Sequence, residues 1–475
     1  MQGVVAAGDR HTARAAAEVM RAGGNAVDAA VAGAFAAFVA EPLLASAGGA
    51  GMLTVAMPDG PAAVVDFFSP VPGRGPRPEK LDFEEVRINF GSAVQSFHIG
   101  HGSVAPPLAL PGLVLASKRF GHLPLEALVA PAAAMARDGV ELGREGALVF
   151  ELLWPIQERS PEALALAGGA RPVQGSTIRN PELAVLLEEL AREGASPTWF
   201  DEAILRDFGP GAGGQLSRED LESAEPQITA PIELALGDWT ALTSPRPGGA
   251  SVARILSELF GSGAGADEAA EVVRVAEACR SARDTRAVLS ARGSTTHVSA
   301  IDKDGGAASI TLTNGEGCGY VARGTGVQLN NFLGEEDLNP GGFHLHDAGG
   351  ALPTMIAPTI ALRDGRPALV LGSGGSNRIR SIVSQVLARV VRGESLEAAV
   401  LAPRVHAEQD DAWVELSGRT DPDAIVRALQ ERFERVHPFP GPAFFFGGVH
   451  TAAVSPGGAR QGVGDARRGG AVEYV

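Results

Sequence analysis

Two runs of alternating residues, 297–301 and 307–313, flank the dipeptide Asp304-Gly305 in the second half of the chain. Alternation with a period of two is typical of β-strands, and Asp-Gly is a preferred centre of a tight hairpin turn. The two runs therefore predict a pair of antiparallel strands. Further strand candidates follow at 327–329, 357–362 and 368–371.

Residues 379–391 carry the clearest helical pattern. Apolar side chains recur there at helical spacing, at Ile379, Ile382, Val383, Val386, Leu387, Val390 and Val391. This spacing predicts a helix that lays one apolar face on a sheet.

Other helices are predicted at 12–21, at 26–40 with Asn25 as its cap, and at 180–193. The stretch 29–40 is apolar but too short to cross a bilayer, so we expect a buried alanine-rich helix. Proline, glycine and charge dominate 69–102, which predicts surface loops.

Composition excludes several classes of function. The net charge of −16 argues against a nucleic-acid surface and against a polybasic membrane patch. The N-terminus shows no leader pattern, so we expect a cytoplasmic protein, provided that no leader has been removed.

No metal or cofactor is expected. Cys279 and Cys318 are too few for a disulfide framework, and they are interpreted as small buried side chains. The histidines, including the pairs His98/His101 and His344/His346, show no accompanying carboxylate or cysteine cluster in the sequence.

Thr295 stands at the head of the predicted hairpin. A threonine hydroxyl is a weak nucleophile unless a base lies beside it, and an N-terminal α-amine can be that base. This interpretation requires cleavage between Ser294 and Thr295, and the charged helical region 267–292 would be an exposed connector leading to the cut. The alternative is that Thr295 only packs in a sheet, as β-branched residues do.

The glycine-rich stretch 372–375 precedes the strongest predicted helix. Glycines let backbone N–H groups approach a reacting oxygen, and a helix N-terminus adds a favourable dipole. Gly374 and Gly375 are therefore candidates for an oxyanion hole. An ordinary strand-to-helix turn is the alternative; a phosphate loop is disfavoured because no lysine follows.

Thirteen segments in order along the chain resemble the γ-glutamyltransferase (glutathione hydrolase) family of N-terminal-nucleophile hydrolases. They are 23–30, 41–42, 48–51, 111–112, 120–121, 136–139, 244–249, 295–297, 329–331, 353–355, 372–375, 402–404 and 465–470. No single segment is decisive, but the ordered set is highly specific.

This resemblance implies an α/β fold, a four-layer αββα sandwich with two antiparallel sheets between helix layers. It also implies self-cleavage into a large fragment, 1–294, and a small fragment, 295–475, which together form one intertwined domain and one protomer. Thr313 occupies the position of a second threonine that hydrogen-bonds the nucleophile; the alternative is a strand-end threonine that caps a turn. His297 is interpreted as structural.

The resemblance assigns the substrate's amino group to Asn314 and Glu335. On the carboxylate side the chain departs from the family: Phe68 stands where an arginine is expected, and Pro353-Thr354 where two serines are expected. The family's glutamine is Phe332 here. A benzyl group cannot bind a carboxylate as a guanidinium does, although Arg74 could reach in from its loop.

The segment between Glu335 and Thr354 is short and glycine-rich, which predicts an open cleft and favours hydrolysis over transfer. The first hypothesis is an autoprocessing threonine hydrolase of a small-molecule or peptide amide, γ-glutamyl or related. The second is an acylase or biosynthetic hydrolase of the same fold, with a more apolar substrate. The third is an uncleaved relative that only binds a ligand or stabilises a partner.

Overall fold

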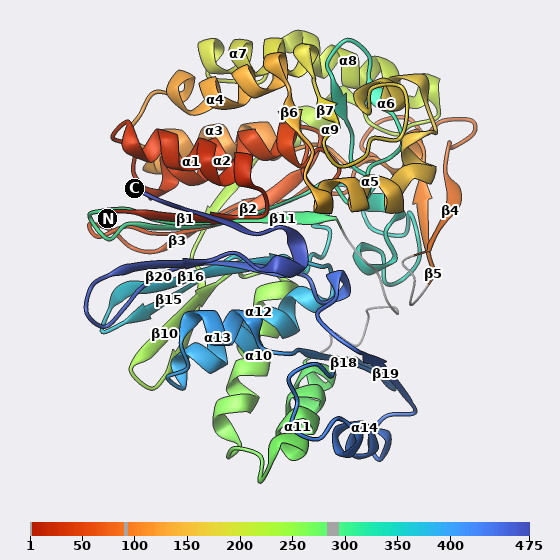
Figure 1. Cartoon of the computed structure of the whole chain (residues 1–475). Coiled ribbons are helices and arrows are strands. Elements are labelled where there is room, and N and C mark those ends of the chain that lie inside the picture. Colours follow the sequence, from red (N-terminus) through yellow and green to blue (C-terminus); the bar gives the residue numbers. More distant parts are fainter. Residues whose placement is uncertain (1, 90–93, 283–293) are drawn as a thin grey trace.

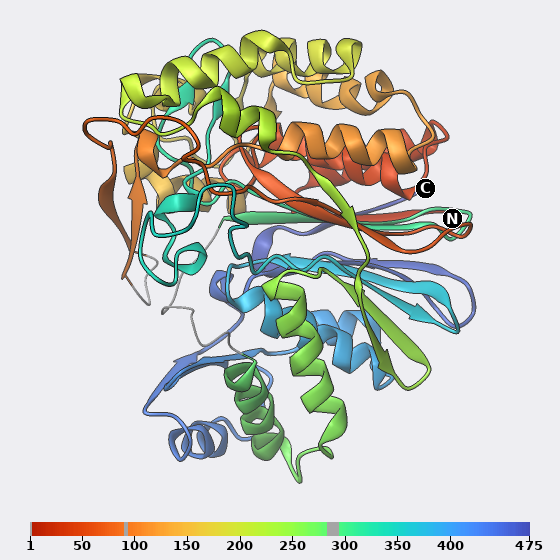
Figure 2. The same ribbon diagram turned by 180° about the vertical axis from the view of Figure 1, so that it is seen from behind.

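The computed structural model describes residues 2–89, 94–282 and 294–475. The chain folds into four layers, with two β-sheets stacked between two layers of helices (Figure 1). The N- and C-termini lie close together at one edge of the first sheet, and the view from behind shows the same stacking (Figure 2). This arrangement confirms the predicted αββα sandwich.

The first sheet has seven strands and holds the predicted hairpin at its centre. Within it, Thr295 pairs with Thr313 and Ile301 pairs with Ala307. In order across the sheet, its strands are β22 (Ala471–Tyr474), β1 (Val4–Ala7), β11 (Thr295–Ile301), β12 (Ala307–Thr313), β2 (Ala50–Ala56), β3 (Ala63–Phe67) and β8 (Gln227–Thr229).

The second sheet has six antiparallel strands and packs on the first. Its order is β21 (Arg460–Val463), β20 (Gly448–Val454), β16 (Arg366–Gly374), β15 (Thr359–Arg363), β10 (Trp239–Thr243) and β9 (Ile232–Leu236). Both sheets contain strands from before and from after Ser294, so the two halves of the chain are intertwined.

One helix layer covers the first sheet (Figure 1). Its innermost helix, α2, is buried along its whole length, which confirms the predicted alanine-rich core helix. Asn25 caps this helix, because its Oδ1 accepts hydrogen bonds of 2.9 Å from the N–H groups of Val27 and Asp28. In return, Asp28 Oδ2 accepts a hydrogen bond of 2.9 Å from Asn25 N, which completes a capping box. The helices on this side are α1 (Arg10–Arg21), α2 (Ala26–Ala40), α3 (Ala109–Phe120), α4 (Leu125–Asp138), α5 (Arg144–Gln157), α6 (Pro161–Leu166), α7 (Pro181–Glu193), α8 (Thr198–Phe208) and α9 (Arg218–Ser223).

The other helix layer covers the second sheet. The predicted helix at 379–391 is α12, which packs on β16; its apolar residues from Ile379 to Leu387 are buried, and Val390 and Val391 are partly buried. These helices are α10 (Pro247–Gly261), α11 (Glu268–Ser281), α12 (Arg378–Val391), α13 (Leu396–Leu401) and α14 (Pro422–Gln430). A small sheet, β17 (Val405–Glu408), β18 (Asp411–Glu415) and β19 (Arg435–Phe439), lies beside α11 and α14.

Two sequence predictions need correction. The stretch 69–102 is not all loop, because β4 (Glu84–Asn89) and β5 (Val94–Ile99) form an antiparallel pair there. The connector before Thr295 is helical over Glu268–Ser281, but one side of that helix is buried rather than exposed, including Cys279. The rest of the predicted connector, 283–292, lies outside the described residues.

Short elements complete the fold. They are the strand pairs β6 (Val140–Glu141) with β7 (Thr177–Ile178) and β13 (Val321–Ala322) with β14 (Val327–Gln328), and the 3₁₀ turns His101–Ser103, Pro210–Ala212, Phe332–Gly334, Glu336–Leu338, Phe444–Phe446 and Ala466–Arg468. Both cysteines are buried and unpaired.

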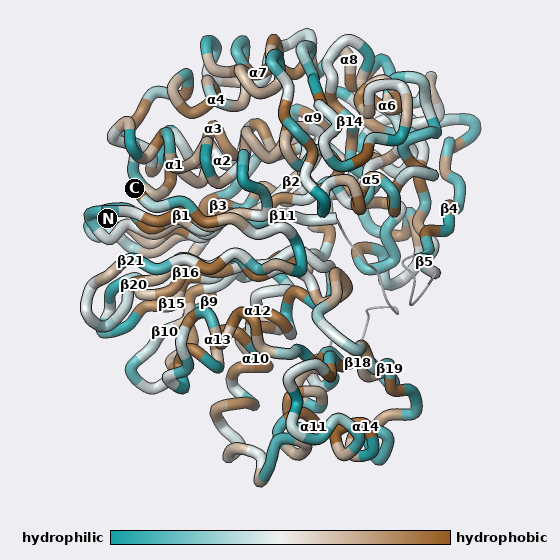
Figure 3. Tube along the Cα trace, in the orientation of Figure 1, coloured by the Kyte–Doolittle hydropathy of each residue, from teal (hydrophilic) through white to brown (hydrophobic). Residues whose placement is uncertain are grey.

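Hydrophobic residues concentrate on the strands and on the inward sides of the helices (Figure 3). Burial of these apolar surfaces holds the four layers together. Within the described residues, no helix combines the length and apolar character that a transmembrane span requires.

Candidate active site

The peptide bond between Ser294 and Thr295 is held at both ends of the Ser294 backbone. Thr313 Oγ1 donates a hydrogen bond of 2.7 Å to the Ser294 carbonyl oxygen. The Ser294 N–H donates one of 3.1 Å to Oε1 of Glu316. Because Thr295 and Thr313 are direct partners across β11 and β12, the hairpin register places the Thr313 hydroxyl at this carbonyl.

The hydroxyl of Thr313 therefore contacts the carbonyl of Ser294, the residue before the predicted nucleophile, and this is the carbonyl that would be attacked. A hydrogen-bond donor on a carbonyl oxygen stabilises the negative charge that develops when the carbon is attacked. The alternative interpretation, a turn cap, is also present, because Thr313 Oγ1 accepts a hydrogen bond of 3.1 Å from Gly315 N.

The glycine stretch of β16 lies against Thr295 from the opposite sheet. A Cβ on Gly374 would stand 2.2 Å from the Thr295 carbonyl oxygen, so only glycine permits this approach. Gly375 has a φ of 127°, and its N–H donates no hydrogen bond within the described part of the chain. The helix α12 begins three residues later, at Arg378.

A pocket with about 340 Å³ of empty volume opens beside Thr295. It brings together five of the residues predicted from the sequence: Thr295, Thr313, Glu335, Thr354 and Phe68. Its other lining residues are Phe332, Asp337, Leu338, Met355, Ile356, Ser376 and Ile379. The pocket is therefore formed by β11 and β12 of the first sheet, by segments that precede β15 and follow β16 of the second sheet, and by Phe68 from the half of the chain before Ser294.

Two phenylalanines form an aromatic wall of the pocket. Phe68 and Phe332 stack with ring centroids 5.0 Å apart and an angle of 26° between their planes. Both side chains are buried. The two phenylalanines that depart from the family pattern are therefore in contact, and they make this side of the pocket apolar.

Carboxyl groups stand on the polar side. Burial, and then the charges of Glu335 and Asp337, raise the pKa of Glu316 well above its usual value. Burial and the charge of Asp337 do the same to the pKa of Glu335. Burial also raises the pKa of Asp337 to about 7. In both groups the cause is chiefly burial, which disfavours the charged carboxylate relative to the neutral carboxyl group.

Four residues predicted to bind substrate or to form the oxyanion hole lie outside the pocket lining. Asn314 is buried, and its Nδ2 lies 3.5 Å from the carbonyl oxygens of Gln328 and Leu329. The guanidinium of Arg74 rests on the backbone of Gly349 instead of reaching the pocket. Gly374 lies against the backbone of Thr295, and Gly375 lies just before the start of α12.

His297 is fully buried between the sheets. Its ring nitrogens lie 2.9 Å from Thr311 Oγ1 and 2.9 Å from Ser299 Oγ. Burial lowers its pKa well below the usual value, so it is a neutral side chain in a hydrogen-bond network. This geometry fits the structural role predicted for it.

The histidines are less isolated than the sequence indicated. His101 Nδ1 lies 2.6 Å from Asp82 Oδ2, and His437 Nε2 lies 2.7 Å from Asp411 Oδ1. These partners are 19 and 26 residues away, which hides them from a search for neighbouring ligands. Across the described ranges, no three His, Cys, Asp or Glu side chains are grouped to hold a metal ion.

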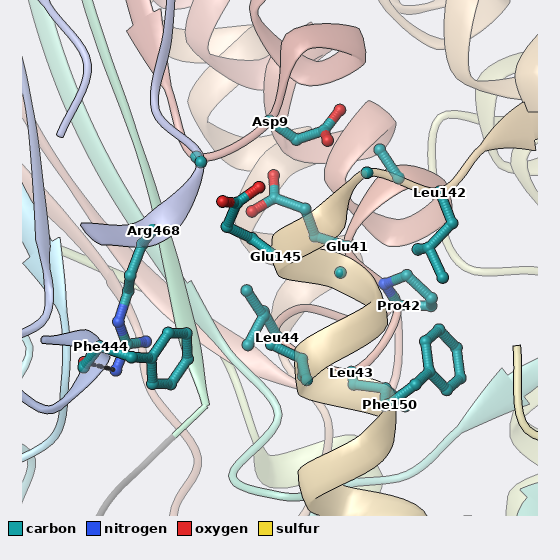
Figure 4. A pocket seen from close by; sticks show the side chains of 16 residues that line it. Asp9, Glu41, Pro42, Leu43, Leu44, Leu142, Glu145, Phe150, Phe444 and Arg468 are labelled. Carbon is teal, nitrogen blue, oxygen red and sulfur yellow. Dashed lines mark hydrogen bonds between the residues drawn. The ribbon is translucent and has the colours of Figure 1, made fainter. Parts of the chain in front are cut away.

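A second pocket lies on the side of the first sheet that faces the helices, near β11 (Figure 4). Asp9, Glu41 and Glu145 stand close together there, above an apolar wall that includes Leu43 and Phe150. Thr296 Oγ1 donates a hydrogen bond of 2.6 Å to Glu41 Oε2, which ties this pocket to the residue after Thr295.

Arg468 borders the second pocket and reaches toward the glycine stretch of β16. Its guanidinium carbon lies 3.9 Å from the Phe444 ring centroid, and its Nη1 would stand 3.0 Å from a Cβ on Gly374. Burial lowers its pKa to about 9. Arg468 is thus a buried cation close to the backbone of Thr295.

Sequence reasoning missed Glu316 and Arg468. Glu316 follows the predicted strand by three residues, and nothing in a lone acid after a strand distinguishes a buried side chain from a solvated one. Arg468 lies in segment 465–470, which carries the family pattern but no local signal for a site residue. Its position in the sequence does not predict that it lies near Thr295, because 173 positions separate 295 from 468.

The sequence is similar to known proteins over nearly its whole length. The gamma-glutamyltranspeptidase family model matches residues 12–291 and 281–475. The acylase ACY 1 proenzyme of Pseudomonas sp. (strain SE83) is 28% identical over 97% of this chain and 91% of that protein. The glutathione hydrolase proenzyme of Escherichia coli (strain K12) is 27% identical, over 98% and 90%.

A solved structure shows the same fold. The crystal structure of cephalosporin acylase from Bacillus halodurans superposes with a TM-score of 0.82 at 21% identity, covering 99% of this chain and 95% of that one. Acylases and glutathione hydrolases thus match this chain to a similar degree.

Proposed function

We propose that this chain, which belongs to the gamma-glutamyltranspeptidase family, cuts itself before Thr295 and then hydrolyses an amide with the freed threonine. The observation that carries the proposal is the contact between Thr313 Oγ1 and the Ser294 carbonyl oxygen, at 2.7 Å. Family membership makes the protein a hydrolase or acyltransferase of this type; the self-cleavage and the residue roles are the proposal.

In the self-cleavage, the Thr295 hydroxyl attacks the carbonyl carbon of Ser294. The C–N bond breaks as the acyl group moves from nitrogen to oxygen, and the nitrogen takes the proton. Thr313 stabilises the developing oxyanion, and Glu316 orients the Ser294 N–H. Water then hydrolyses the ester, which leaves a carboxylate on Ser294 and a free amine on Thr295.

In the mature enzyme, the free amine of Thr295 takes the hydroxyl proton while the oxygen attacks the substrate carbonyl. The leaving amine receives that proton, and an ester to Thr295 remains. Water resolves the ester to an acid and regenerates the hydroxyl. An N-terminal amine has an ordinary pKa of about 7.7–8.0, so a useful fraction is an uncharged base near pH 7.

The Gly375 N–H is the proposed donor to the oxyanion in this second reaction. Among the described residues it has no hydrogen-bond acceptor, it follows a glycine in contact with Thr295, and it lies close to the N-terminus of α12. Glu335 and Thr354 are the proposed substrate contacts on the pocket wall, with Phe68 on the apolar side. Asn314 supports the loop that carries Glu316.

Hydrolysis is proposed over transfer. The segment after Glu335 is short, and residues 349–351 pair with the chain at 70–71 instead of extending over the pocket: Val71 N donates to Gly350 O over 2.8 Å, and Gly349 N to Val71 O over 2.8 Å. Water therefore has access to the acyl group. Cytoplasmic location remains an expectation from the sequence.

One observation favours a second candidate, an acylase with a more apolar acyl group. The stacked rings of Phe68 and Phe332 remove polar contacts on one side of the pocket. A panel of acyl 4-nitroanilides tests both candidates, with Thr295→Ala as the blank. Hydrolysis that Thr295→Ala abolishes and Thr295→Ser retains in part supports the proposal; equal activity in Thr295→Ala contradicts it.

A further inference from the structure

The pocket beside Thr295 carries acidic groups but no cationic ones on its wall. Of its lining residues, Glu335 and Asp337 are acids, and none is lysine or arginine. The pocket also has a large apolar share, with Phe68, Phe332 and Ile379 among its lining residues. A ligand that fits this wall is apolar over most of its surface and has one positively charged end.

The two acids differ in what they already bind. Asp337 accepts hydrogen bonds from the hydroxyl of Ser376 and, over 3.0 Å, from Asn377 Nδ2. Glu335 is only 5% exposed, and no residue in the described part of the chain donates a hydrogen bond to its carboxyl group. Because Glu335 lines the pocket with acceptor oxygens that no described side chain occupies, it is the group that a hydrogen-bond donor of a ligand would satisfy.

Three arginines of the surrounding segments lie outside the lining of this pocket. Arg246 Nε donates a hydrogen bond of 2.6 Å to Asp66 Oδ2, and the other oxygen of Asp66 accepts from Phe68 N over 3.0 Å. Arg378 Nε donates to the carbonyl oxygen of Phe445 over 3.1 Å. Neither side chain lines the pocket, and Arg468, the buried cation near the Thr295 backbone, lines the second pocket instead. The wall beside Thr295 therefore offers no cation to a substrate carboxylate.

We infer that this site takes acyl groups that carry an ammonium group and no carboxylate. The inference rests on the proposed function and names the substrate class of the same site. A γ-glutamyl group bears an ammonium and a carboxylate on one carbon. Removing the carboxylate gives 4-aminobutyryl, which keeps the ammonium at the same number of bonds from the carbonyl. In the site, Glu335 ionises and pairs with this ammonium, while the methylene chain lies along the aromatic wall.

Four 4-nitroanilides separate the two charges. The γ-glutamyl anilide has both, the 4-aminobutyryl anilide has only the ammonium, the glutaryl anilide has only the carboxylate, and the butyryl anilide has neither. Initial rates of 4-nitroaniline release by the purified enzyme give kcat/KM for each. Thr295→Ala under the same conditions corrects for uncatalysed release, including cyclisation of the 4-aminobutyryl group.

The 4-aminobutyryl anilide is expected to exceed each of the other three by about 10- to 100-fold in kcat/KM, the range of a hydrogen bond to a charged group. A γ-glutamyl or glutaryl preference would overturn the inference, because the site would then pair with a carboxylate. A butyryl preference would overturn it as well, because the site would then be purely apolar.

Variants assign the preference to Glu335. In Glu335→Gln, the ratio of 4-aminobutyryl to butyryl kcat/KM should fall about tenfold or more, because a neutral amide cannot neutralise an ammonium. The matched control is Glu336→Gln, which changes the neighbouring acid outside the pocket lining and should keep the ratio. An unchanged ratio in Glu335→Gln contradicts the inference.

Phe68→Arg offers an independent check on the other wall. A guanidinium there should shift the preference toward the γ-glutamyl anilide. Failure of the inference is distinguishable from failure of the proposed function. A chain that is cut before Thr295 and prefers butyryl disproves only the inference, whereas a chain that stays intact and hydrolyses none of the anilides disproves both.

Discussion

The hydroxyl of Thr296 donates a hydrogen bond of 2.6 Å to Glu41 Oε2, which joins the second residue of β11 to the end of α2. The other oxygen of Glu41 accepts a hydrogen bond of 2.8 Å from Thr12 Oγ1. Burial, and then the charge of Asp9, raise the pKa of Glu41 to about 8. This carboxyl therefore links the stability of the site to pH.

Glu41→Gln is expected to change how stability depends on pH. The ordinary pKa of Glu41 is 4.5 and its folded value is about 8. Between these values the folded state binds more protons than the unfolded state, so the contribution of Glu41 to the free energy of unfolding falls as pH rises. Relative to Glu41→Gln, the wild type should therefore lose stability between about pH 5 and about pH 8.

Urea unfolding of both proteins across this range measures the difference. His406 and His450, whose pKa values burial lowers to about 4, act in the opposite direction, but they are present in both proteins and cancel. A difference in the free energy of unfolding that does not vary with pH would refute this account of Glu41.

Thr313→Val should slow self-cleavage by about 10- to 100-fold, because the Ser294 carbonyl loses its donor while the shape of the side chain is kept. Thr313→Ser retains the hydroxyl and should cleave at close to the wild-type rate. The measurement is the fraction of cut chain against time after synthesis. Equal rates for Thr313→Val and wild type would rule out this role.

Glu316→Gln should keep self-cleavage within a few-fold of wild type. Burial raises the pKa of Glu316 well above its usual value, which favours the neutral carboxyl group, and a carboxamide oxygen can still accept from Ser294 N. Glu316→Ala removes that acceptor and should slow cleavage by about tenfold. If Glu316→Gln instead abolished cleavage in a folded protein, the ionised carboxylate would be required and the positioning role would be wrong.

Asp28→Ala should destabilise the protein by about 1–3 kcal/mol. Asp28 Oδ2 accepts hydrogen bonds of 2.9 Å from Asn25 N and from His122 N, so its removal leaves both donors without this partner. Chemical unfolding measures the loss. Glu151→Ala, an exposed change in the middle of α5, is the matched control and should be close to neutral.

The elements predicted best from the sequence are those whose pattern is local. The hairpin on either side of Asp304-Gly305 and the cap at Asn25 depend on neighbouring residues, and both are present. The pair β4 and β5 was missed, because charged residues and the prolines and glycines before it indicated loops.

The candidate site divides in the same way. Thr295, Thr313 and Phe68 were found because they lie in recognisable segments, and the pocket joins them. Glu316 was not found, because its hydrogen-bond partner, the Ser294 N–H, lies 22 residues earlier in the chain. The partner that occupies Arg246, Asp66, is 180 residues away. Only the fold shows that this arginine is engaged.

The most direct test is the intact mass of the purified wild-type protein, with N-terminal sequencing of each polypeptide. The account predicts two polypeptides, 1–294 and 295–475, the second beginning with Thr295, and a single uncut chain for Thr295→Ala. Wild-type protein that hydrolyses an acyl anilide yet consists only of the full-length chain would contradict it.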